Sequence, residues 1–436
     1  MTPTSVAAGT LADFSRKKGR DLIGRLEPFD RYQVARQQEG SWFYTRTSLG
    51  APSPEVKVLG HDGQVVHGVN LANQDYLSLA SHPLIREAAV RALTEFGPHS
   101  AGSPCGVGET TASRALEQEL AEFLHAEHVL LFPTGWAAGF GSIYGLVGRD
   151  DYIVMDQLAH QCLQQGAYAA TSKVRKFSHL DTDSACAILS EIRARDSDNA
   201  ILVITEGLFS MDSDTPDIAK LQAICHEYGA ALLVDVAHDL GATGPGGRGA
   251  LGLQDMLGRV DLVMGSFSKT FASNGGFLAS RSRAVKSSVK YFGGSHMFSN
   301  AIAAFQASVV HAAIKIVRSD EGEHLRARLR RVVDTLRNGF GGRDIQCWGA
   351  PSPIVPVAIG DEVLARELNR LLPRRGVIAQ MIEYPAVPLG KSRIRLQAMA
   401  GHTPGQAELA VQLISDVVEE TRRVIGEQHA YFSGRA

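Results

Sequence analysis

Two polar residues in the middle of the chain each follow an apolar run of the length of a strand. Asp235 closes the run 231–234, and Lys269 follows residues 261–264 within the sequence Gly-Ser-Phe-Ser-Lys. Because neighbouring parallel strands present their carboxyl ends to one crevice, a carboxylate and an amine at these positions can act on the same group. Pyridoxal phosphate (PLP) needs both, a lysine for a Schiff base and a carboxylate beside its pyridine nitrogen. The pair therefore predicts a PLP site.

Lys269 is the expected catalytic amine. A free lysine, with a pKa of about 10.4, is a poor nucleophile at neutral pH, but an incoming amine readily displaces it from a PLP imine. The freed amine can then remove the proton from the α-carbon of the substrate. Asp235 should meet a cation, because an unpaired buried carboxylate is unfavourable, and the pyridinium suits it. His238, three residues later, is expected to reach the phenolic oxygen of the ring.

Five small or loop-placed residues are expected at the phosphate. Ser266 and Ser268 carry short hydroxyl groups beside the lysine, although serines at such positions also serve simply to shape a turn. Thr134, Gly135 and Trp136 follow a predicted strand and precede an Ala- and Gly-rich helix start. The free N–H groups of such a helix start hold phosphate.

Two further residues are candidates for the ring and the substrate. His160 comes just after a predicted strand and could stack on the cofactor, although a histidine there is also commonly structural. Arg395 lies in the apolar run 394–399. A buried arginine suits a bidentate grip on a substrate carboxylate, with an internal salt bridge as the open alternative.

The elements that would position these residues alternate between strands and helices, which favours an α/β fold with a mostly parallel sheet covered by helices. The predicted strands of this region are 129–132, 152–155, 201–205, 231–235 and 261–265. Three domains are expected, namely an N-terminal arm over 1–66, a large PLP-binding domain over 67–300, and a smaller α+β domain over 301–436.

The composition limits the class of protein. Lysine and arginine number 44 against 46 acidic residues, so neither nucleic acid nor an anionic membrane is expected as the main partner. The five cysteines lack metal-ligand spacing, and reduced thiols in a cytoplasm with no bound metal are the simplest interpretation. The basic cluster 16–18 follows an apolar stretch, the reverse of a secretory signal, and polar residues interrupt the best candidate for a membrane span, 301–317.

From about residue 65 onward, the chain resembles the α-oxoamine synthases, a group of fold-type I PLP enzymes. The segments that carry the resemblance, in the family's order, are 75–83, 206–212, 235–238, 247–249, 266–269, 297–299, 385–388, 393–395 and 400–403. The resemblance implies a homodimer with shared active sites. It implies that Lys269 forms the Schiff base, that Asp235 and His238 hold the ring, and that His160 stacks on it.

The resemblance assigns the remaining site residues as well. The serines Ser266 and Ser268 with the loop around Gly135 match the phosphate side, and Ser210, in the segment 206–212, is counted with the cofactor-binding residues. Ser299 matches a hydroxyl donated by the other subunit, and Arg395 matches the residue that holds the amino-acid carboxylate.

The implied reaction joins a small amino acid to an acyl thioester, carried by coenzyme A or an acyl carrier protein, and releases carbon dioxide and free thiol. An aminotransferase or a decarboxylase on the same scaffold is the alternative, since fold alone does not determine function. A non-catalytic subunit is disfavoured because Lys269 is present. The chain departs from the family pattern at Pro104, Ser113, Gly139 and Val236, which leaves the amino acid and the acyl chain undetermined.

Overall fold

The computed structural model describes residues 9–433, with the side chains of 9–425. Two compact units make up the chain. The small unit comprises Met1–Asn73, Met211–Ser213 and Arg328–Ala436, and the large unit comprises Gln74–Ser210 and Asp214–Ala327. The predicted order of three consecutive domains therefore differs from the division that the contacts give, in which the small unit draws on both ends of the chain.

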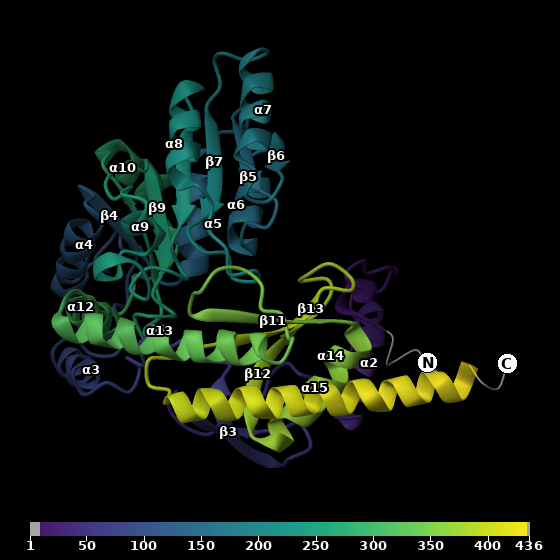
Figure 1. Ribbon diagram of the computed structural model, residues 1–436. Coiled ribbons are helices and arrows are strands. Elements are labelled where there is room, and N and C mark those ends of the chain that lie inside the picture. Colours follow the sequence, from purple (N-terminus) through teal and green to yellow (C-terminus); the bar gives the residue numbers. More distant parts are fainter. Residues whose placement is uncertain (1–8, 434–436) are drawn as a thin grey trace. The chain divides into compact units, whose positions relative to one another are not determined.

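The large unit is built on a seven-stranded sheet in the order β4-β10-β9-β8-β7-β5-β6 (Figure 1). Its strands are β4 (His128–Phe132), β5 (Tyr152–Asp156), β6 (Val174–Phe177), β7 (Ile201–Glu206), β8 (Ala231–Asp235), β9 (Leu262–Ser266) and β10 (Gly276–Ser280). The pairs from β6 across to β9 are parallel, and β10 runs antiparallel to both β9 and β4. The predicted α/β fold with a mostly parallel sheet is confirmed.

Helices pack around this sheet, and several of them, such as α3 and α4, carry one apolar face. They are α3 (Pro83–Phe96), α4 (Thr111–Leu124), α5 (Gly135–Leu146), α6 (Gln161–Ala170), α7 (Thr182–Arg193), α8 (Ile218–Glu227), α9 (Gly249–Leu253), α10 (Arg283–Phe292), α11 (Gly294–Met297) and α12 (Ala304–Arg318), with a 3-10 turn η3 (Pro245–Gly247). The segment α12 packs on α3 and α4, so residues 304–318 belong to the large unit rather than to the predicted C-terminal domain. None of the helices within residues 9–433 has an apolar stretch long enough to span a bilayer.

The small unit contains a six-stranded sheet in the order β1-β2-β3-β12-β13-β11. Its strands are β1 (Thr47–Ser48), β2 (Glu55–Leu59), β3 (Val65–Leu71), β11 (Ile354–Gly360), β12 (Val377–Ile382) and β13 (Ser392–Gln397). Its helices are η1 (Leu11–Phe14), η2 (Gly24–Leu26), α2 (Glu27–Gln38), α14 (Glu362–Leu371), η4 (Leu372–Arg375) and α15 (Pro404–Ser433), and α13 (Asp320–Gly341) has residues in both units. Because β3 pairs in parallel with β12, the N-terminal residues share a sheet with the C-terminal ones instead of forming a separate arm.

Three of the four departures from the family pattern have local structural reasons. A Cβ on Gly139 would lie 2.6 Å from Cys162 Sγ, so glycine lets α5 approach α6 closely. Ser113 completes a capping box at the start of α4, where its Oγ accepts from Thr110 N at 2.9 Å. Val236 is buried just after β8, where a charged side chain would be unfavourable. These substitutions are thus compatible with the fold, and nothing in the structure explains Pro104.

Asp239 makes stability depend on pH. Burial raises the pKa of its carboxyl from 3.8 to about 7, although the N–H of Ala250 partly opposes the shift. The folded chain therefore binds this proton more tightly than the unfolded chain. The resulting stabilisation is full below about pH 4 and is lost as the pH rises through about 7. We expect Asp239→Asn, which stays neutral, to gain at least about 2–4 °C in melting temperature relative to the parent between about pH 5 and pH 8.

Thermal melts of both proteins at the two pH values check this expectation. The amide oxygen of asparagine can still accept the hydrogen bond that Ala250 N gives to the carboxylate at 2.7 Å. A difference in melting temperature that stays constant over this range would show that Asp239 does not ionise as described.

Candidate active site

A pocket of about 280 Å³ lies in the large unit at the carboxyl ends of β7, β8 and β9. Most of the predicted site residues line it. The lining residues are Thr134, Gly135, Trp136, His160, Cys162, Glu206, Asp235, Ala237, His238, Met264, Ser266, Ser268, Lys269, Asn274 and Gly275. A larger cavity of about 620 Å³ lies at the opposite, amino ends of the strands and contains neither a lysine nor the predicted residues. The smaller pocket is therefore the candidate active site.

Two buried carboxylates lie beside Lys269 in this pocket. Asp235 ends β8 and is 6% exposed, and Glu206 is its register partner at the end of β7. Burial raises the pKa of Asp235, while the charges of His160 and Lys269 lower it. Burial and the charge of Asp235 raise the pKa of Glu206 well above its usual range. Two buried carboxylates beside one lysine favour a further cation, which the pyridinium of PLP would supply.

Two histidines flank the pocket. His238 is held by Tyr76, whose hydroxyl lies 2.8 Å from its Nδ1. His160 is the N-cap residue of α6, and its backbone N donates to Glu206 Oε1 at 2.6 Å. The ring of His160 meets that of Trp136 edge-on, with centroids 6.2 Å apart. Each imidazole thus has a fixed neighbour, Tyr76 for His238 and Trp136 for His160.

The end of the pocket that is predicted to hold the phosphate, here called the phosphate end, is formed by the start of α5 and the end of β9. Thr134 caps α5 by accepting from Ala137 N at 3.0 Å, and Ser266 Oγ lies 2.8 Å from Ser268 Oγ. A Cβ on Gly135 would lie 2.5 Å from Ser266 Oγ, so only glycine allows this approach. The two hydroxyl groups and the helix N-terminus fit a phosphate. Together with the buried carboxylates, they make these residues compatible with PLP.

Gly135 gives a prediction for this end of the pocket. A methyl group there must push the start of α5 away from β9, and overpacking of this kind is unfavourable by about 1–3 kcal/mol. We expect Gly135→Ala to raise the dissociation constant of PLP by about tenfold or more, measured by titrating cofactor-free protein. Gly405, in the first turn of α15, has open space around its Cα and makes the matched control. Equal affinities of the Gly135→Ala and Gly405→Ala variants would contradict the prediction.

Three predicted residues do not line the pocket. Ser210 follows β7 in the large unit, and Ser299 follows α11 in the same unit. Arg395 belongs to the small unit, where it is buried on β13 and donates to Gln380 Oε1 at 2.6 Å. Their predicted roles in cofactor and substrate binding stay predictions.

Glu206, which lines the pocket, and Tyr76, which holds one of its histidines, were assigned no role from the sequence. Glu206 ends an apolar strand just as Asp235 does, so the same rule could have found it. Tyr76 lies far from His238 in the sequence, and no local signal connects the two residues.

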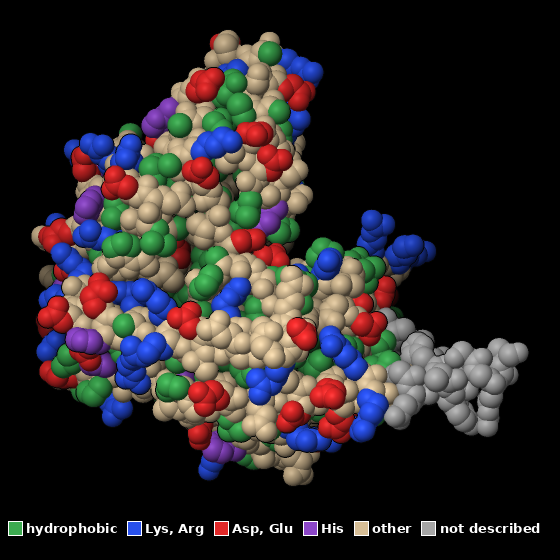
Figure 2. Space-filling model, in the orientation of Figure 1, with side chains coloured by type: hydrophobic (Ala, Val, Ile, Leu, Met, Phe, Trp, Pro, Cys, Tyr) green, Lys and Arg blue, Asp and Glu red, His purple; other side chains and the backbone are tan. Residues whose placement is uncertain are grey.

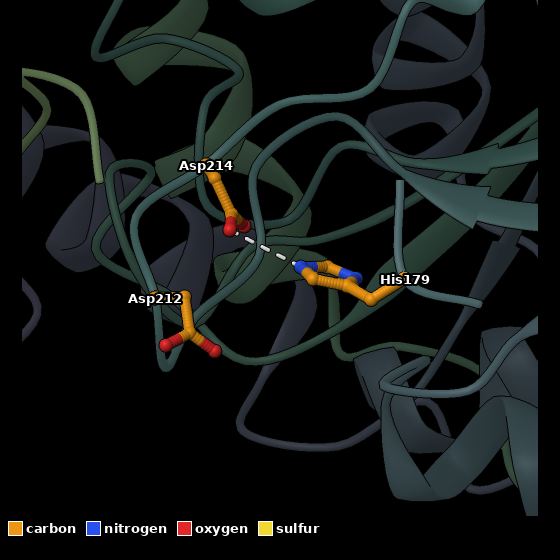
Figure 3. Close-up of side chains that lie close together, drawn as sticks. All are labelled: His179, Asp212 and Asp214. Carbon is orange, nitrogen blue, oxygen red and sulfur yellow. Dashed lines mark hydrogen bonds and ion pairs between the residues drawn. The ribbon is translucent and has the colours of Figure 1, made fainter. Parts of the chain in front are cut away.

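A histidine that contacts two carboxylates also lies at this edge of the sheet. Nδ1 of His179 lies 2.9 Å from an oxygen of Asp156. Its Nε2 lies 3.1 Å from Asp214 Oδ2, the contact that Figure 3 shows. Burial alone would lower the pKa of His179, but the hydrogen bonds to the two carboxylates outweigh it and raise the pKa to about 10. The protonated ring therefore joins the end of β5 to the segment after β7.

Comparison with known proteins places the chain in a family. Residues 66–414 match the model of the aminotransferase class I and II family. The 8-amino-7-oxononanoate synthase of Coprothermobacter proteolyticus is 31% identical over 395 residues, which cover 91% of this chain and 98% of the relative. That of Salmonella arizonae is 36% identical over 334 residues, covering 77% and 85%. The chain belongs to the α-oxoamine synthases of this family.

Solved α-oxoamine synthases share the fold. The serine palmitoyltransferase of S. paucimobilis, solved with PLP and myriocin, superposes with a TM-score of 0.86 at 24% identity over 92% of this chain and 99% of that one. The serine palmitoyltransferase of Sphingomonas wittichii gives a TM-score of 0.85 at 26% identity over the same shares of the two chains. The fold-type I architecture of the α-oxoamine synthases is therefore confirmed for this chain.

Proposed function

We propose that this protein is a PLP-dependent C-acyltransferase. It joins a small α-amino acid to an acyl thioester, of coenzyme A or an acyl carrier protein, and yields an α-aminoketone, carbon dioxide and free thiol. The observation that carries the proposal is the pocket in which Lys269 and Asp235 meet at the ends of adjacent strands, in a chain of this family. Five free cysteines support a cytoplasmic location.

Each residue has a defined task in this proposal. PLP, when bound, withdraws electrons from the α-carbon of the amino acid. Lys269 Nζ removes the proton from that carbon and later returns one, and Asp235 keeps the pyridine nitrogen protonated. His160 would stack on the ring of bound PLP, and His238, oriented by Tyr76, would hold its phenolic oxygen. Arg395 holds the carboxylate of the amino acid until it leaves as carbon dioxide.

A homodimer is part of the proposal. The loop 101–108 contacts the region around α10 and α11, since Ser103 Oγ donates to Met297 O at 2.7 Å. Large apolar side chains stand exposed on this region, among them Phe298 at 83%, Phe292 at 71% and Val107 at 92%. Exposed apolar surface of this extent marks an interface, and a second copy would cover it. Ser299, next to Phe298, would then reach the partner's site, and the mass in solution tests the dimer.

The experiment that tests the function offers the purified protein each small amino acid together with an acyl-CoA series, and measures carbon dioxide and free thiol. We expect equal amounts of both from one preferred pair of substrates. Formation of a keto acid without thiol would establish an aminotransferase instead, and carbon dioxide without thiol would establish a decarboxylase. Acyl carrier protein charged with the preferred chain then identifies the natural donor by its lower KM.

A further inference from the structure

A turn near the N-terminus concentrates positive charge. We call residues 15–26, which join η1 to α2, the basic turn. It carries five basic residues and one acidic residue, although the whole chain has a net charge of −2. Figure 2 shows Lys and Arg side chains standing out where Figure 1 draws the purple segment before α2. The chain as a whole has nearly equal numbers of positive and negative charges, but the basic turn has a clear excess of positive charge.

The cations of the basic turn are available to a partner. Arg16, Lys17, Lys18 and Arg20 are exposed, and none forms an ion pair with any residue that the structure describes. The one acidic residue, Asp21, instead accepts a hydrogen bond from Ile23 N at 3.0 Å.

Aliphatic side chains stand beside these cations. Ile23 is 79% exposed, Leu22 is 66% exposed and Leu26 is 42% exposed. A single exposed leucine is ordinary, but adjacent aliphatic side chains at the tip of a turn, flanked by cations, match the composition of segments that enter a membrane interface.

The basic turn is attached to a packed aromatic cluster. Phe14 before the turn and Phe29 after it pack on Tyr32 and Trp42. The hydroxyl of Tyr32 also donates to Gly9 O at 2.7 Å. The aromatic side chains on either side of the basic turn thus pack against one another, while Leu22 and Ile23 within it are exposed. The N-terminal region therefore has a packed core of its own, which these two side chains do not join.

We propose that the basic turn binds the surface of an anionic lipid bilayer. Its cations would contact lipid phosphates, while Leu22 and Ile23 would lie among the acyl chains. An acidic carrier protein would also attract the cations, but a protruding tip with two aliphatic side chains suits a deformable lipid interface better than a protein surface. The binding needs no substrate, so it stands or fails independently of the proposed reaction.

The test is co-sedimentation of the full-length protein, loaded with PLP, with vesicles. We expect binding to vesicles of phosphatidylglycerol and phosphatidylcholine, much weaker binding to phosphatidylcholine alone, and a loss of binding as salt rises. Removing three cations by Lys17→Ala, Lys18→Ala and Arg20→Ala should weaken binding at least about 20-fold. Replacing the two tip residues by Leu22→Ser and Ile23→Ser should weaken binding at least about tenfold with the charges intact.

Matched variants separate these effects from total charge and total apolar surface. Three exposed arginines of α13 provide the charge control, Arg328→Ala, Arg330→Ala and Arg331→Ala. Two exposed aliphatic residues of the small unit provide the apolar control, Val65→Ser and Leu389→Ser. Both controls should bind the anionic vesicles within about twofold of the parent.

Four results would overturn the proposal. The first is equal binding to the two kinds of vesicle or to neither, and the second is an equal loss in the controls. The third is an oligomer that dissociates in the Leu22 and Ile23 variant while vesicle binding persists, which would make the turn an interface between copies. The fourth is a cation variant that binds vesicles normally but loses turnover with acyl carrier protein, which would make it a carrier-protein site.

Discussion

Replacing Lys269 by alanine is expected to lower kcat by about 10⁴-fold or more, with the fold intact. The side chain supplies both the amine that holds the cofactor covalently and the base that moves the α-proton, and loss of a general base alone reaches about 10⁴. Asp235, His160 and the phosphate end of the pocket are untouched by this change. The variant should therefore still bind PLP, but without a covalent link.

Borohydride reduction followed by mass spectrometry detects the covalent bond between Lys269 and PLP directly. The parent should retain the mass of the cofactor on the peptide that contains Lys269, whereas the variant should retain none. Lys315→Ala, on an exposed position of α12 in the same unit, is the control and should behave like the parent. Turnover at the parental rate in the Lys269→Ala variant would overturn the proposed mechanism.

Asp235→Asn is expected to lower kcat by about 10²–10³-fold, the usual effect of removing one preorganised electrostatic contact. Asparagine keeps the shape of aspartate and can still accept the hydrogen bond that Ala237 N gives to Oδ1 at 2.9 Å. It has no negative charge, however, so it cannot keep the pyridine nitrogen protonated. The KM for the amino acid should change much less than kcat, since Asp235 does not contact the substrate carboxylate in this proposal.

Asp261 provides the matched control for this variant. It precedes β9 at the opposite end of the same strands and accepts a hydrogen bond from Leu232 N at 2.9 Å. Asp261→Asn changes the same charge on the same sheet, away from the pocket, and should keep kcat within about threefold. Steady-state kinetics and the visible absorption of bound PLP distinguish the two variants. Similar losses in both would mean that the sheet, not the pyridine contact, is responsible.

The predicted parts of the large unit share one property, a long buried apolar run. The strand that ends in Asp235 and the strand that precedes Lys269 were predicted within one residue, because parallel strands covered on both faces are apolar throughout. The strand β6 was missed because it lies at the edge of the sheet and carries the charged Arg175 and Lys176. The strand β10 was missed because it begins with glycine and ends with serine, residues that are typical of turns.

For the site, too, residues near a recognisable apolar strand could be predicted, whereas contacts between distant segments could not. Asp235, His238 and Lys269 could be predicted because each stands at the end of a recognisable strand or close after one. The contact between Tyr76 and His238 could not, since it depends on where a distant loop returns to the sheet. No local signal indicates the composition of the small unit either, because the pairing of β3 with β12 joins segments from opposite ends of the chain.

The position of β10 sets the order in which the pocket can be completed during synthesis. This strand lies between β4 and β9, and it pairs Gly276 with Phe132 on one side and with Ser266 on the other. The turn 134–136 follows β4, so it reaches its place beside Ser266 only after β10 has been made and inserted. Such long-range pairing is slow compared with local structure. A nascent chain that ends just after Lys269 would thus contain the reactive amine and its carboxylate but not the assembled phosphate end of the pocket. Cofactor capture would therefore have to wait until β10 has been made and paired.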